Sequence, residues 1–122
     1  MANAINWFEI PAKNLDRACA FYSAVLGGEI HREEIMGSHM GFLPHGQDEV
    51  GGALVQGDGY EPAANGSLIY LNAGEDLSVA LGKVESAGGA VVVPKTKISD
   101  EIGYFAIFQD TEGNKLAFHS PA

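Results

Sequence analysis

The spacing of apolar side chains changes from every second residue to helical spacing within the first 28 residues. Alternation over residues 4–11 predicts a strand in which Trp7 and Glu9 project to one face, while Phe8 and Ile10 project to the other. Large side chains on both faces indicate a strand that is buried on both sides. Helical spacing follows over residues 14–26 and predicts a helix with Asn14 as its N-cap. The apolar stripe of this helix contains Leu15, Ala18, Cys19, Tyr22 and Leu26.

Turn-forming residues divide the rest of the chain into further short elements. Gly27-Gly28 ends the first helix, and strands are predicted at about 28–36, 39–44 and 50–57. The segment "GDGYEPAANG" is rich in turn formers and indicates a linker at about 58–66. The remaining prediction is a strand over 67–73, a helix over 74–89, and strands at 90–99, 103–110 and 115–120.

The two halves of the chain follow one plan. Gly27-Gly28 and Gly88-Gly89 lie 61 residues apart, as do Trp7 and Leu68. Matching strand-helix-glycine patterns at a fixed spacing indicate an internal duplication. The sequence therefore predicts a single α+β domain of two βαβββ modules, forming a curved eight-stranded mixed sheet around a cavity. The modules are expected at about 1–57 and 67–122, with the linker at about 58–66 between them.

Composition narrows the class of partner. The 122 residues carry a formal charge of −9, spread through both halves, and such a surface repels nucleic acid and anionic lipid. No apolar run approaches the roughly 20 residues that cross a bilayer. The start of the chain lacks a signal-peptide pattern, and the single cysteine, Cys19, cannot form an internal disulfide. We expect a cytoplasmic protein with no nucleic-acid or membrane partner.

Several segments resemble one protein family. They are "IPAKNLDRACAFYSAVLGGEI", "GGALV", "GEDLSVALGKVESAGG" and "FQDTEGNKLAFHS". With these, the chain resembles the vicinal oxygen chelate superfamily, which includes glyoxalase I, extradiol dioxygenases and bleomycin-resistance proteins. The turn "QDTEGNKL" is the most specific piece, and "WFEIP" is similar to the start of small bacterial glyoxalase-like proteins. The resemblance implies a homodimer, since the family commonly pairs its modules across subunits.

The resemblance also locates a family metal site, with one ligand from the first and last strand of each module. These positions hold Trp7, Ala53 (or a neighbour of it), Leu68 and Ala117. None of the four side chains is an imidazole, carboxylate or thiolate, the groups that bind divalent cations. We therefore expect no metal and no other cofactor.

Strand alternation predicts which residues line the cavity instead. Trp7 and Glu9 share the inward face with Gly51, Ala53 and Val55, while Leu116 and Phe118 are expected to pack beneath the helices. The expected ligand-binding residues are Trp7, Glu9, Ala53, Leu68, Tyr70, Asn72, Ala117 and His119. An aromatic floor with small residues and few polar groups is typical of a small-molecule pocket.

Each polar candidate also has a structural explanation. Glu9 could accept structural hydrogen bonds, His119 could be an exposed or satisfied imidazole, and Tyr70 could be a core residue with a hydrogen-bonded tip. His31, His39 and His45 have no ligand spacing and are interpreted as surface residues.

Three functions remain open from the sequence. The first is a metal-independent protein that binds a small organic molecule. The second is a lyase or isomerase that acts on a small carbonyl compound, with Glu9 and His119 as catalytic residues for proton transfer in one cavity. The third and weakest is a metal-dependent lyase or dioxygenase with unusual ligands such as Glu9 and His119. No nucleophile motif, phosphate loop or dinucleotide fingerprint is present.

Overall fold

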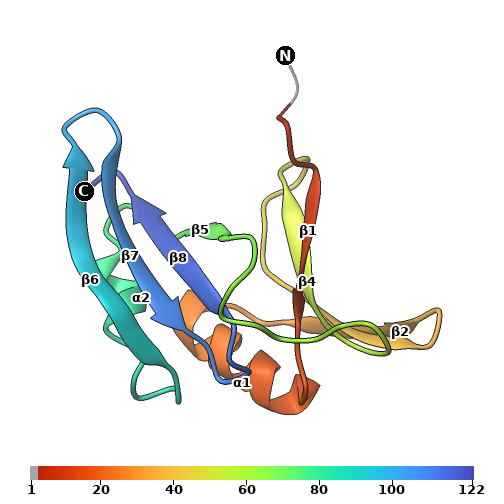
Figure 1. The fold of residues 1–122 in the computed structure, drawn as a ribbon. Helices are drawn as coiled ribbons and strands as arrows, with labels where there is room; N and C mark the ends of the chain where they lie inside the picture. Colours follow the sequence, from red (N-terminus) through yellow and green to blue (C-terminus); the bar gives the residue numbers. More distant parts are fainter. Residues whose placement is uncertain (1–2) are drawn as a thin grey trace.

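The computed structural model describes residues 3–122, which fold as two similar α+β halves (Figure 1). The first half contains β1 (Trp7–Pro11), α1 (Leu15–Leu26), β2 (His31–Ile35), β3 (Ser38–Phe42) and β4 (Gly51–Gln56). The second half contains β5 (Tyr70–Asn72), α2 (Ser78–Leu81), β6 (Ala90–Ser99), β7 (Gly103–Gln109) and β8 (Lys115–Ser120). Residues 1–2 of the expected first module lie outside the described part of the chain.

The two halves have the same strand order. One four-stranded sheet, which we call sheet A, has the order β1-β4-β3-β2, and the other, sheet B, has the order β5-β8-β7-β6. In each sheet, the first and last strands of the module (β1 with β4, β5 with β8) pair in parallel, and the remaining pairs are antiparallel. The repetition confirms the expected pair of βαβββ modules.

The eight strands are divided between two sheets rather than joined in one. β1 and β5, the first strand of each half, each lie at one edge of their sheet. β5 has only three residues, and residues 57–69 before it form neither helix nor strand. Such a short strand offers few backbone groups for a ladder with β1, so the expected single eight-stranded sheet is corrected to two four-stranded ones.

Helix α1 agrees closely with the expectation. The Asn14 side chain accepts a 3.1 Å hydrogen bond from the backbone N–H of Arg17, which caps the helix start. Gly27 ends the helix in the left-handed region, with φ of 76°, and its N–H donates to the carbonyl of Ser23. The expected stripe is buried except for Leu26, which is half-buried. Phe21 and Val25 are buried in addition.

The second helix is much shorter than expected. The sequence predicts a helix over 74–89, whereas α2 spans Ser78–Leu81 and residues 82–88 form turns. The N–H groups of Lys83 and Val84 donate to carbonyls three residues back, which is not the α-helical pattern. Gly82 lies at the point of change, and a glycine in a helix interior costs about 1 kcal/mol relative to alanine. The apolar period alone did not reveal this break.

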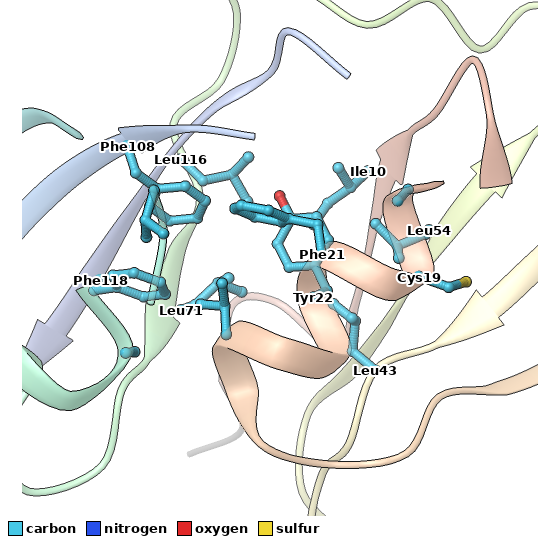
Figure 2. Close-up of a cluster of buried hydrophobic side chains, with 14 of the residues drawn as sticks. Ile10, Cys19, Phe21, Tyr22, Leu43, Leu54, Leu71, Phe108, Leu116 and Phe118 are labelled. Carbon is cyan, nitrogen blue, oxygen red and sulfur yellow. The ribbon is translucent and has the colours of Figure 1, made fainter. Parts of the chain in front are cut away.

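The core lies where α1 meets the inner faces of both sheets. Figure 2 shows Phe21 and Tyr22 of α1 between Ile10 and Leu54 of sheet A and aromatic residues of sheet B. The rings of Phe108 and Phe118 stack at 4.4 Å, and Phe21 meets Tyr22 edge-on at 4.9 Å. Burial of each such side chain contributes roughly 1.5–3 kcal/mol. Leu116 and Phe118 belong to this core, as the alternation pattern predicts.

Strand β1 is buried on one side only. Ile10 is 1% exposed and faces the core, whereas Trp7 is 40% exposed and Glu9 is exposed on the opposite, outer face. The expectation of burial on both sides is therefore wrong. β1 is an edge strand of sheet A, and Trp7 and Glu9 on its outer face are exposed.

The turn between β7 and β8 forms hydrogen bonds and a salt bridge that join the second half of the chain to the first. The buried carboxylate of Glu112 accepts hydrogen bonds from the backbone N–H groups of Lys13 and Asn14, at 2.9 and 2.8 Å. It also forms a salt bridge of 2.6 Å with Arg17. The Asn114 side chain donates to the carbonyl of Pro11 at 2.7 Å, so the end of β1 is held beside the start of β8.

Candidate ligand-binding site

The strand register places the expected site residues of the first half on one face. In the parallel β1–β4 pair, Trp7 lies opposite Gly51 and Glu9 lies opposite Ala53. Paired residues project to the same side of a sheet, so Ala53 lies beside Glu9 on the outer face of sheet A. Ala53 is nevertheless fully buried, because Phe42 and Tyr60 pack over it. Tyr60 comes from the segment after β4, which folds back over the sheet.

Glu9 is held between two aromatic side chains. The hydroxyl of Tyr60 donates a 2.7 Å hydrogen bond to Oε1 of Glu9, and the indole N–H of Trp7 donates to Oε2 at 3.4 Å. The Trp7 ring lies 6.0 Å from the ring of Phe42. We call Trp7, Glu9, Phe42 and Tyr60 the Glu9 cluster. The hydrogen bond to the Glu9 carboxylate raises the pKa of Tyr60, so its hydroxyl remains a proton donor.

Two adjacent glycines make room for side chains on both faces of β4. A Cβ atom added at Gly51 would lie 2.6 Å from Cδ2 of His45, and one at Gly52 would lie 2.4 Å from Cζ of Phe8. His45 therefore lies over Gly51, on the outer face that also carries Trp7. The ring of His31 stacks on Phe42 at 6.1 Å.

His31 and His45 are exposed, as the sequence indicates, but their rings also border the outer face of sheet A. Sequence reasoning missed this role for His31 and His45, and it missed Phe42 and Tyr60 entirely. The pair Gly51-Gly52 was the one available signal, because glycine in a strand often marks a close approach of other groups.

The expected residues of the second half share a face of sheet B. Tyr70 lies opposite Ala117, and Asn72 lies opposite His119. The Nε2 atom of His119 lies 2.6 Å from the carbonyl oxygen of Ile102. A carbonyl can only accept, so this nitrogen carries the proton. Tyr70 is 53% exposed, and Leu68 lies just before β5.

Three of the expected site residues border two different pockets. Glu9 lines a pocket of about 220 Å³ together with Glu61, Ser67 and Lys115. Tyr70 and Asn72 line a second pocket of about 700 Å³; its other residues include Phe8, His45, Glu49 and Leu71. His119 lines neither pocket. The expectation that Glu9 and His119 share one cavity therefore stays a prediction.

The four positions that correspond to family metal ligands carry no ligand groups. Trp7 and Leu68 are partly exposed, while Ala53 and Ala117 are fully buried. Within residues 3–122, no three His, Cys, Asp or Glu side chains gather in a way that could hold a metal ion. This part of a single chain therefore does not fit a family-type metal centre, and metal independence stays a prediction.

A family model supplies the decisive comparison. The model described as Glyoxalase/Bleomycin resistance protein/Dioxygenase superfamily matches residues 4–118. The chain belongs to this superfamily. The match confirms the resemblance that the sequence motifs indicate, and it spans both modules of the glyoxalase-like fold.

Solved structures agree with this assignment. A hypothetical protein, SA1046 from S. aureus, is 28% identical with a TM-score of 0.69, and 98% of each chain is covered. UcmS2 is 22% identical with a TM-score of 0.71 and full coverage of both chains. A mutant glyoxalase I from Zea mays is 15% identical with a TM-score of 0.75, covering 97% of this chain and 45% of the other. The last two similarities show the fold alone.

No match was found among curated proteins. Within residues 3–122, no helix has both the length and the apolar character needed to span a membrane.

Proposed function

We propose that this glyoxalase-like protein binds a small organic molecule on the outer face of sheet A, with the Glu9 cluster at the centre of the binding surface. The observation that carries the proposal is the position of Glu9. Its carboxylate is exposed, yet it is held from both sides by hydrogen bonds from Tyr60 and Trp7. A fixed polar group on an aromatic and apolar wall is the arrangement that orients small ligands.

We further propose that a second copy of the chain completes the site. Trp7, Leu68 and Tyr70 are large apolar side chains that are 40%, 36% and 53% exposed in the single chain. Contact with a second copy would cover these residues. It would also bring a sheet B face, with Asn72 and His119, against the Glu9 cluster of the first copy. Light scattering at micromolar concentration should give the mass of a dimer, and a monomer would contradict this part of the proposal.

Binding is proposed to need no divalent metal, because Trp7, Ala53, Leu68 and Ala117 occupy the ligand positions of the family. Protein purified without chelator should contain less than one equivalent of divalent cation. One equivalent of tightly held nickel, zinc or iron would overturn metal independence and would favour a lyase or dioxygenase with unusual ligands.

Proton transfer is the second candidate function. Glu9 has the position of a general base, because it is exposed and hydrogen-bonded to the hydroxyl of Tyr60. With His119 supplied from the second copy, the site would resemble that of a lyase or isomerase acting on a small carbonyl compound. Turnover that is lost in both Glu9→Gln and His119→Ala would favour the enzyme over the binding protein.

A ligand screen tests the main proposal. Wild-type protein is screened by thermal shift against small organic compounds, with EDTA and with added divalent metals. We expect hits that stabilise the protein equally in both conditions. Affinity for these hits should fall in Glu9→Gln and remain unchanged in Glu85→Gln, which neutralises an exposed carboxylate of the second half. Equal affinity in Glu9→Gln and wild type would contradict a ligand role for Glu9.

A further inference from the structure

The charge and the ring geometry of the Glu9 cluster point to a particular class of ligand. We infer that the cluster binds the positively charged group of an organic cation, such as an alkylammonium head on an apolar body. This inference rests on the proposed function, because it concerns the ligand of the same site.

The carboxylate of Glu9 is the first reason. An ionised carboxylate only accepts hydrogen bonds, and its two oxygens have about four lone-pair positions. Tyr60 and Trp7 occupy one position on each oxygen. Within residues 3–122, Glu9 takes part in no salt bridge with a lysine or arginine. Its exposed charge is thus available to a donor or a cation from solution.

The aromatic rings are the second reason. Trp7 and Tyr60 flank the carboxylate, and Phe42 lies 6.0 Å from the Trp7 ring, tilted by 58°. The face of an aromatic ring carries negative partial charge and attracts cations, with tryptophan the strongest of the three. Rings of this kind around a carboxylate favour a cation with apolar substituents over a strongly hydrated inorganic ion.

The surrounding charge is the third reason. The neighbouring pocket of about 220 Å³ is lined by two carboxylates, Glu9 and Glu61, against one ammonium group, Lys115. The whole chain carries a formal charge of −9. Both the local and the overall field therefore oppose an anionic ligand and attract a cationic one.

The position of the single tryptophan makes a direct test available. Trp7 is the only tryptophan of the chain, so its fluorescence and its indole N–H signal in NMR spectra report from inside the cluster. Three probes of similar size are titrated into the full-length protein: benzyltrimethylammonium, benzyl alcohol and phenylacetate. They share a benzyl body and differ in carrying a positive, a neutral and a negative group.

We expect benzyltrimethylammonium to give a saturable change in both Trp7 signals. Its affinity should be about tenfold or more above that of the other two probes, as expected for Coulombic attraction to a carboxylate and contact with ring faces. In Glu9→Gln this preference should fall by about tenfold, and Tyr60→Phe, which keeps the ring, should retain most of it. Glu85→Gln is the matched control and should behave as wild type.

The outcomes separate the inference from the proposed function. If benzyl alcohol or phenylacetate binds as tightly as the cation, the charge preference is wrong while the binding site stands. If the cation binds equally well to Glu9→Gln, the role of the carboxylate is wrong. If none of the three probes changes the Trp7 signals, and the thermal-shift screen yields no compound that does, both the inference and the proposed function are overturned.

Discussion

The hydroxyl of Tyr22 donates a 2.8 Å hydrogen bond to Oδ2 of Asp110, a residue 88 positions further along the chain. Tyr22 is fully buried in the middle of α1, and Asp110 begins the turn between β7 and β8. The bond therefore joins the helix of the first half to the turn of the second. It places a polar connection inside an otherwise apolar core, close to the rings of Phe21 and Phe108, which lie 6.0 Å apart and are tilted by 31°.

Removal of the Tyr22 hydroxyl should weaken the fold measurably. Tyr22→Phe keeps the ring but leaves one oxygen of Asp110 with a single remaining bond, from the side chain of Asn114. We expect the free energy of unfolding in urea to fall by about 1–3 kcal/mol. Tyr70→Phe is the control, because Tyr70 is more than half exposed, and its effect should stay within about 0.5 kcal/mol. Equal effects of the two substitutions would contradict the structural role of this bond.

Stability should depend on the ionisation of Glu112. Burial alone would raise the pKa of this carboxyl, but hydrogen bonds from Arg17 and the backbone of Asn14 outweigh burial and hold it below the ordinary value of 4.5. A group with a depressed pKa in the folded state stabilises the fold above its unfolded-state pKa. The stabilisation should be complete above about pH 4.5 and should be lost as the pH falls through the lower, folded-state pKa.

Urea denaturation across this range gives the measurement. Wild-type protein should lose stability as the pH falls below 4.5, and Glu112→Gln should show a shallower loss over the same range. The variant Glu33→Gln, at an exposed position on β2, should follow the wild type. A Glu112→Gln curve parallel to that of the wild type would show that this carboxylate is not responsible.

The adjacent glycines of β4 should tolerate no side chain. In Gly52→Ala the new methyl group would lie 2.4 Å from the ring of Phe8, so the ring or the strand has to move. We expect a loss of about 1–3 kcal/mol in unfolding free energy, which is typical of an overpacked site. Gly66→Ala is the matched control, because its added Cβ meets no atom within 4 Å and should cost little. Unchanged stability in Gly52→Ala would argue against the packing of Phe8 on this strand.

A surface ion pair provides a spectroscopic check of the second half. Hydrogen bonds from the Lys95 ammonium and from Ser78 lower the pKa of Asp76 to about 2. The carboxyl signal of Asp76 in NMR titrations should therefore have its midpoint near this value. In Lys95→Gln the midpoint should rise toward the ordinary value of 3.8. An unperturbed midpoint in the wild-type protein would mean that the pair does not persist in solution.

The local pattern of the sequence determined most of the elements. Alternation along β1 predicted that Trp7 and Ile10 project to opposite faces of the strand. Asn14 and Gly27 predicted the two ends of α1. These features depend on residues a few positions apart, so the period and the caps are visible without a structure. The same reasoning overestimated the length of α2, because an apolar period continues past Gly82 although the backbone does not remain α-helical.

The partners of the site residues were decided only by the tertiary structure. Tyr60 reaches Glu9 across 51 positions, and Glu112 reaches Arg17 across 95, so no local period signals either contact. Which carboxylate meets which donor depends on how the segment after β4 folds back and how the β7–β8 turn docks on α1. The sequence by itself determined that Glu9 lies beside Trp7 on one strand face. Packing between distant segments decided that Tyr60, and not His119, bonds to it within one chain, because only the folded chain brings those backbones together.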